Sequence, residues 1–98
     1  MLDRVLVIED FADKIGNLFA VSMQDADIAL HLIETSPLPN RRGPEHRQPF
    51  SLIFRAADPH VLPQQLYRIT HDALGEMAIF LVPVGRDEDG IQYQATFN

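Results

Sequence analysis

Histidine is the side chain in this sequence best suited to acid–base or metal chemistry, because it titrates near neutral pH and binds metals when neutral. Four are present, His31, His46, His60 and His71, and no two are spaced two or four residues apart. A metal site needs several converging ligands, so this scatter predicts none. His71, followed by Asp72, is the best candidate for proton transfer. No nucleophile stands beside it and Asp72 favours a turn, so we expect a structural role for His71.

Two further groups could support chemistry. Tyr67 and Arg55 lie in apparent strands, and together with His71 they could line the mouth of a barrel as a small-ligand-binding or hydrolytic site. The simpler interpretation of Arg55 is an ion pair with a carboxylate on a neighbouring strand. The acidic run Asp87–Gly90 lacks the spaced ligands of a calcium loop and predicts a solvated hairpin turn. We therefore expect no cofactor.

Arginines gather in one proline-rich stretch. Ser36–Pro49 contains four prolines, the three arginines Arg41, Arg42 and Arg47, and one glutamate, so its net charge is +2. Proline cannot donate to a strand ladder, which predicts a loop here. The loop could dock on an acidic partner or simply be mobile. The whole chain carries a net charge of −6 and the loop lacks aromatic residues, so we expect no binding to nucleic acid.

The remaining sequence alternates apolar and polar residues in six segments joined by turns, which predicts antiparallel strands. A short helix over Glu9–Gly16 precedes them, with Phe11 and Ile15 on one face. Six twisted strands bury one apolar face by curling or by stacking in two layers. The predicted fold of the single domain 1–98 is mainly β, a six-stranded antiparallel barrel or sandwich with a short N-terminal helix. The expected core is Phe19, Val21, Ile28, Leu30, Leu32, Phe50, Leu52, Phe54, Tyr67, Ile69, Ile79, Leu81, Tyr93 and Phe97.

Two of the strands carry specific expectations. Met77–Val82 is apolar at every position, which is typical of a strand covered on both faces. Pro83 should stop or bulge its ladder. The last strand, Ile91–Phe97, has Gln92 and Gln94 on its polar face. At a sheet edge this strand could accept a strand from a partner or a second copy, whereas in a closed barrel no such edge exists.

Cysteine is absent, which suits a reducing compartment. The first eight residues are too short and too acidic for a signal peptide, and no apolar run reaches membrane length. We therefore expect a cytoplasmic protein without membrane contact, unless it leaves the cell within a larger assembly.

The order of several stretches is distinctive. The second half contains Pro49–Arg55, Leu62–Tyr67, His71–Glu76, Phe80–Gly85 and Tyr93–Asn98, and the first half contains Asp10-Phe11, Ile15-Gly16 and Phe19. This order resembles a family of small bacterial proteins of unknown function, whose genes often lie beside phage tail-collar and tail-fibre-like genes. The resemblance covers nearly the whole chain except Ser36–Gln48. It implies no activity, cofactor or catalytic residue, and it suggests an accessory role in a tail-like or fibre assembly.

These observations favour a non-enzymatic binding or structural module, an accessory of a phage-tail-like or fibre assembly. Its protein partner would contact Arg41, Arg42 and Arg47 in the loop, or Gln92 and Gln94 in the last strand. The alternative is a small-ligand-binding or hydrolytic barrel that uses His71, Tyr67 and Arg55. A deep pocket lined by those three side chains would favour the alternative, and a shallow surface with a flat apolar edge would favour the binding module. The sequence makes no prediction of oligomeric state.

Overall fold

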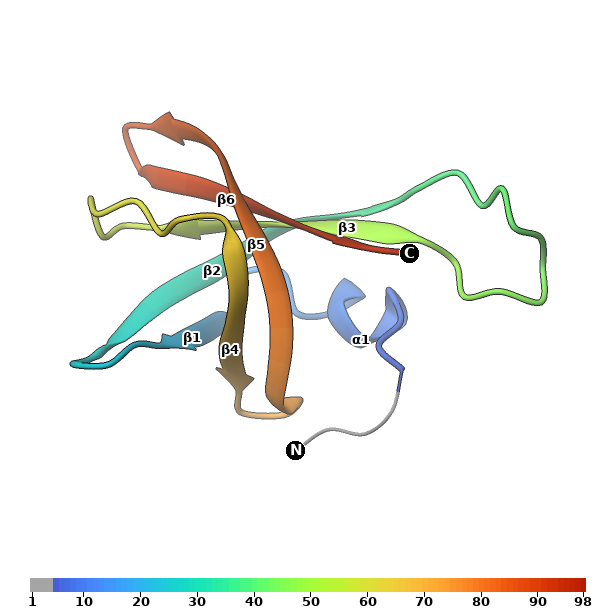
Figure 1. Cartoon of the computed structure of the whole chain (residues 1–98), viewed down its shortest axis with the longest axis horizontal. Coiled ribbons are helices and arrows are strands. Elements are labelled where there is room, and N and C mark those ends of the chain that lie inside the picture. Colours follow the sequence, from blue (N-terminus) through green and yellow to red (C-terminus); the bar gives the residue numbers. More distant parts are fainter. Residues whose placement is uncertain (1–4) are drawn as a thin grey trace.

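The strands form a closed antiparallel barrel in the order β1-β2-β3-β6-β5-β4, with β4 pairing back onto β1 (Figure 1). The computed structural model describes residues 5–98. The barrel confirms the predicted six-stranded antiparallel fold and excludes the sandwich. The elements are α1 (Glu9–Ala12), β1 (Leu18–Ser22), β2 (Asp27–Pro37), β3 (Phe50–Ala56), β4 (Gln65–His71), β5 (Gly75–Asp87) and β6 (Gly90–Phe97).

The core occupies the inside of the barrel, because alternate side chains of each strand point inward. All of the predicted core residues are buried except Ile28 and Phe97, which are partly buried against the same cluster. Residues outside the predicted core list are buried with them: Phe11, Ala56, Leu62, Leu74, Met77, Ile91 and Ala95.

Helix α1 contributes the most important of these additions. It ends at Ala12 and not at Gly16 as predicted, so Ile15 does not share its face and stays 53% exposed. The Phe11 side chain is fully buried, with its ring centroid 6.3 Å from Phe19, 5.9 Å from Phe50 and 6.0 Å from Phe97. A single turn of helix therefore places one aromatic ring between β1, β3 and β6.

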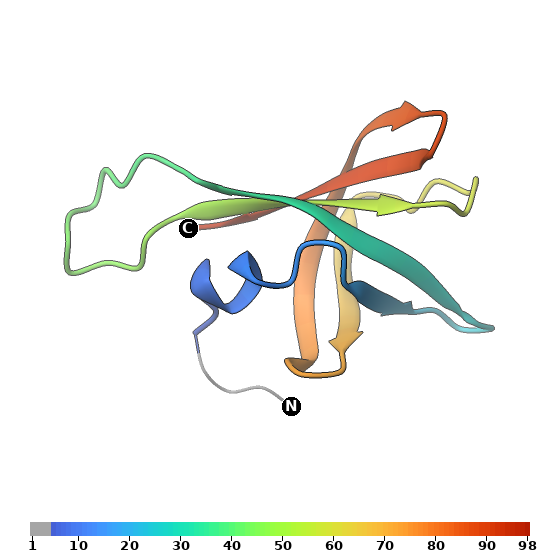
Figure 2. The ribbon, with the colours of Figure 1, turned by 180° about the vertical axis from the view of Figure 1, so that it is seen from behind.

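Strand β5 is long and changes neighbours along its length. Its first part, Gly75–Leu81, pairs with β4, and its second part pairs with β6 from Val82 to Asp87. The ladder with β6 shifts between Pro83 and Gly85, which confirms the bulge predicted at Pro83. Figure 2 shows the β4–β5 hairpin turning away from β6 beyond this point.

Strand β6 lies between β3 and β5, so it is not the edge strand that the sequence left open as one alternative. Gln92 pairs with Arg55 on one side and with Gly85 on the other, and Gln94 pairs with Ile53 and Val82. A partner strand therefore cannot add at Gln92 and Gln94, because both sides of the backbone are already occupied.

The expectation that Met77–Val82 is covered on both faces is wrong. Met77, Ile79 and Leu81 are buried, whereas Ala78 and Phe80 are exposed on the outer face. Among residues 5–98 no second layer packs over this outer face of the hairpin. The continuous apolar sequence Met77–Val82 therefore reflects an apolar outer surface on β5 and not a strand covered on both faces.

The proline-rich loop is shorter than predicted and projects from the barrel (Figures 1 and 2). Strand β2 continues through Ser36 and Pro37, and Pro37 pairs with Phe50 as its last residue, so the loop runs from residue 38 to 49. Hydrogen bonds at its base, Leu38 N–H to the Pro49 carbonyl (2.9 Å) among them, close the hairpin. In the described part of the chain, no helix is long and apolar enough to span a membrane.

Candidate functional site

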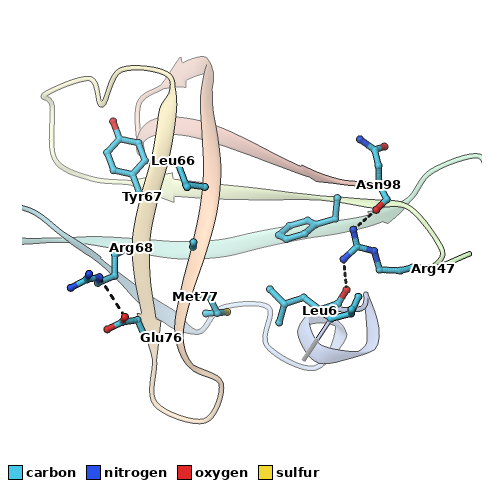
Figure 3. A pocket seen from close by; sticks show the side chains of 11 residues that line it. Leu6, Arg47, Leu66, Tyr67, Arg68, Glu76, Met77 and Asn98 are labelled. Atoms are coloured by element: carbon cyan, nitrogen blue, oxygen red, sulfur yellow. Dashed lines mark hydrogen bonds and ion pairs between the residues drawn. The ribbon is translucent and has the colours of Figure 1, made fainter. Parts of the chain in front are cut away.

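A cavity of about 700 Å³ lies where β5 turns away from β6. Its apolar lining includes Leu6 before α1, Tyr67 on β4, Met77 on β5 and Phe97 at the end of β6. Figure 3 shows Tyr67 and Met77 of the hairpin on one side of the opening, and Leu6 and Asn98 near the two ends of the described chain on the other. Because the four come from widely separated parts of the sequence, only the barrel's topology brings them together.

Arg47 holds the far wall of the cavity in place. Its guanidinium donates one hydrogen bond to the Leu6 carbonyl (2.8 Å) and another to the main-chain oxygen of Asn98, and it lies 5.9 Å from the centre of the Phe97 ring (Figure 3). Its Nε is buried without a hydrogen-bond partner among residues 5–98. Arg47 therefore anchors the base of the loop to both ends of the described chain.

Arg41 and Arg42 do not share the structural role of Arg47. Both are exposed in the projecting loop, and the Arg42 backbone N–H donates to the side-chain oxygen of Asn40 (3.3 Å). The three arginines predicted as one docking group therefore divide into two exposed side chains in the loop and one structural anchor at its base.

Apart from Arg47, polar side chains that line the cavity make a weak ion pair and a hydrogen bond. On the outer rim Arg68 Nε lies 3.4 Å from Glu76 Oε1, an exposed pair that adds little stability (Figure 3). The Tyr67 hydroxyl donates to the Pro63 carbonyl at 2.5 Å. Burial raises the pKa of the Tyr67 hydroxyl, which keeps it protonated in this role as a donor.

His71 is buried at the end of β4 and both of its ring nitrogens have partners. Its Nδ1 accepts the backbone N–H groups of Ala73 (3.0 Å) and Leu74 (3.2 Å), so Nε2 carries the proton that is donated to the side-chain oxygen of Asn17 (2.9 Å). The ring also packs 4.6 Å from that of Phe19. These contacts shape the β4–β5 turn.

The three side chains of the alternative site do not converge. Tyr67 lines the cavity, whereas His71 and Arg55 do not. Arg55 instead pairs with Asp87 at 2.9 Å, and Gln92 donates to the same carboxylate oxygen at 2.8 Å. The ion pair predicted for Arg55 is thus present, although its partner lies at the end of β5, one strand beyond its neighbour β6.

The remaining histidines and acidic residues are dispersed. His31 is exposed on β2, and His46 and His60 lie in loops beside Glu45 (3.6 Å) and Asp58 (2.9 Å). Over the described range no three His, Cys, Asp or Glu side chains are placed to hold a metal ion.

The acidic run at the β5–β6 turn is hydrogen-bonded within itself. Asp87 Oδ1 accepts the Asp89 backbone N–H at 2.9 Å. This bond, with further help from Arg55 and Gln92, lowers the pKa of the Asp87 carboxyl. The run forms the hairpin turn that the sequence predicted.

An apolar pair outside the barrel was not identified from sequence. Leu66 on β4 stands opposite Phe80 on β5, and they are 62% and 46% exposed. Leu66 also lines the cavity, so the outer face and the cavity meet along the hairpin. The signal in the sequence was Phe80 itself, an aromatic residue on the outer phase of an otherwise alternating strand.

Comparison with known proteins gives a family without a function. No curated protein and no solved structure matches the chain. Residues 6–97, which include every helix and strand described above, match the family model of a domain of unknown function (DUF6916). The resemblance to a family of unknown function is confirmed to that extent. The chain therefore belongs to the DUF6916 family.

Proposed function

We propose that this protein is a non-enzymatic binding module that recognises another protein through the outer face of the β4–β5 hairpin and the adjoining cavity. The observation that carries the proposal is the exposed pair Leu66 and Phe80, 62% and 46% accessible, beside an apolar cavity of about 700 Å³. Contiguous apolar surface of this kind typically marks a contact site in a small protein. Large aromatic and aliphatic side chains beside a cavity are also the usual anchors of protein interfaces.

The contacts of the catalytic candidates support the same conclusion. To act as a base, His71 would have to give up the hydrogen bonds that shape the β4–β5 turn. Tyr67 donates to a backbone carbonyl and Arg55 is paired with Asp87. Each of these side chains is occupied in holding the barrel together, which favours a role in structure.

The proposal is tested by isolating partners from the native host with tagged variants of the chain. Leu66→Ser combined with Phe80→Ser removes the apolar pair, and partner recovery should fall at least about tenfold, the effect expected for losing an interface anchor. The matched control is Leu18→Ser with Val61→Ser, since those side chains are 55% and 54% exposed and neither lines the cavity. Equal recovery by both double variants would show that the hairpin face is not the contact.

A second candidate function is the binding of a small apolar molecule in the same cavity. Its volume lies within the roughly 300–1,000 Å³ of small-molecule sites. Native mass spectrometry of protein purified from the host separates the two candidates. A retained small molecule would favour this second function, and a retained polypeptide would favour the first.

We further propose that the partner belongs to a phage-tail-like or fibre assembly, with the chain acting in the cytoplasm before or during assembly. The support is the sequence resemblance described above. The exposed Arg41 and Arg42 would provide a second contact, while Arg47 serves the fold. Changing Arg41 and Arg42 together to Glu should weaken recovery of a tail or fibre subunit. Recovery of only unrelated proteins by the native chain would contradict this assignment.

A further inference from the structure

The first part of β5 is a strand edge inside a closed barrel. The register of β5 with β6 begins at Val82↔Gln94, whereas Gly75–Leu81 pairs with β4 alone. On the other side of the opening, the end of β6 from Ala95 to Phe97 pairs with β3 alone. The two strands diverge beyond this point (Figure 1). Met77 on β5 and Phe97 on β6 both line the cavity.

An edge of this kind has a definite chemistry. Alternate residues of a strand direct their N–H and C=O groups to opposite neighbours, so about half of those groups between Glu76 and Leu81 face away from β4. Within residues 5–98, strand pairing gives this stretch no second neighbour. The groups that suit it best are the N–H and C=O groups of another extended chain.

The edge carries few of the features that prevent such pairing. Natural edges are protected by lysine, proline, bulges or a covering element. Between Glu76 and Leu81 there is one charged residue, Glu76, and the bulge at Pro83 comes after the stretch. The opposite wall, formed by Leu6 and Phe97, leaves the cavity between itself and the strand. Glu76, Met77 and Ala78 line this cavity, so that end of the edge is set in an apolar groove and is not sealed.

We propose that an extended segment of a partner protein adds to β5 as a further strand along Glu76–Leu81, with one end in the cavity between β5 and the end of β6. The inference rests on the proposed binding function and specifies its site and its partner's chemistry. Six residues of β5 offer roughly 20 Å of edge at 3.3 Å per residue. The added strand would place alternate apolar side chains against Met77 and Phe97, which line the groove.

The charge on the groove favours an acidic segment. Among the described residues that line it, the charged side chains are Arg47 and Arg68 against Glu76. Arg68 is exposed, and its Nε lies 3.4 Å from Glu76 Oε1 in a weak surface ion pair. Its side chain can therefore turn to an incoming carboxylate at little cost in free energy. We therefore expect the segment to carry a Glu or Asp beside its apolar positions.

Hydrogen exchange of the free protein tests the edge directly. Amides from Glu76 to Leu81 should alternate between slow exchange, where the N–H bonds to β4, and fast exchange, where it faces the cavity. The matched stretch is Ile91–Gln94 of β6, which pairs with β3 on one side and with β5 on the other and should lack this alternation. Slow exchange of every amide from 76 to 81 in the free monomer would overturn the proposal.

A peptide pool tests the occupant. The pool contains acetylated hexapeptides that begin with Glu and carry Val, Ile, Leu or Phe at alternate positions. Binding should slow the exchange of the cavity-facing amides of β5. N-methylation of alternate peptide amides should weaken binding about tenfold, because it removes ladder donors without changing the side chains. Failure of the whole pool to bind, or equal binding of the N-methylated peptides, would overturn the proposal.

Two further measurements separate the possible occupants and the two hypotheses. Arg68→Glu should weaken the acidic peptides, whereas Arg86→Glu, a control outside the groove, should not. Sedimentation of the free protein must show a monomer, since a dimer that shields the β5 edge would make a second copy the occupant and overturn the proposal. If a host protein binds through Leu66 and Phe80 but leaves exchange along β5 unchanged, the binding function stands and strand addition is wrong. If the native chain recovers no protein partner and no peptide binds, both are wrong.

Discussion

Replacing Phe11 by alanine tests whether the single helical turn α1 is part of the barrel core. The Phe11 side chain is 0% exposed and packs against three other aromatic rings, with 5.9 to 6.3 Å between ring centroids. Phe→Ala substitutions in packed cores destabilise by about 3–5 kcal/mol. A domain of this size has a total stability of about 5–15 kcal/mol, so the loss would remove a large part of it.

Urea unfolding followed by tyrosine fluorescence or circular dichroism measures the effect. With a slope of about 2 kcal/mol per molar urea, the midpoint should fall by about 2 M. Ile15→Ala is the matched control in the same segment, because Ile15 is 53% exposed, and it should change stability by no more than about 0.5 kcal/mol.

A loss below about 1 kcal/mol for Phe11→Ala, near the effect of a surface change, would refute the idea that α1 closes the core. Equal losses for both variants would refute it as well, since they would point to the segment's backbone and not to the buried ring. A selective loss at Phe11 would establish that the short helix stabilises the same aromatic cluster that positions Phe97 at the cavity.

Three other substitutions test separate contacts. Gly90→Ala should lower the free energy of unfolding by more than about 1 kcal/mol, because Gly90 has φ +140° and an added Cβ would lie 2.1 Å from the Ala56 carbonyl oxygen. Gly85→Ala is the control in the same thermal unfolding assay. Its added Cβ would meet only a side-chain atom at 3.8 Å, so its effect should be much smaller. His71→Ala should lose about 2 kcal/mol or more by leaving buried backbone N–H groups of the β4–β5 turn unpaired, and a near-neutral result would contradict the role given to its ring. The pKa of Asp87 is lowered from 3.8, so its contribution to stability is present above about pH 4 and is lost as the pH falls through the folded pKa. The urea midpoints of the native chain and of Asp87→Asn should therefore differ at neutral pH and converge in acid. A difference between the two midpoints that widens in acid would refute this account.

The alternation of apolar and polar residues predicted most of the fold, because side chains that point into a barrel must be apolar whatever the strand order. Pro83 likewise predicted its own bulge, since a missing N–H is a local property. Phe11 could not be assigned in the same way. One helical turn has no period to detect, and its burial depends on where β1, β3 and β6 meet.

The candidate site was harder to predict than the fold. Phe80 was interpreted as covered because an apolar outer phase normally indicates a second layer, and only the tertiary arrangement shows that the hairpin carries none among the described residues. Arg47 was grouped with Arg41 and Arg42 by its place in a loop, but its contacts are with Leu6 and Asn98, at the two ends of the described chain. The cavity depends on the divergence of β5 from β6, which no local pattern encodes.

The hydrogen bonds of Arg47 have a consequence for how the chain could be rearranged. Leu6 and Asn98 lie within reach of a single guanidinium group, so a short linker could join them without disturbing the barrel. New ends could be opened in the projecting loop, between Arg41 and Arg42, where both residues are exposed. Such a circular permutation would keep every strand neighbour. It would also turn β2 and β3 from a hairpin into the last and first strands of the chain, and so exchange a local contact for the longest-range contact in the fold.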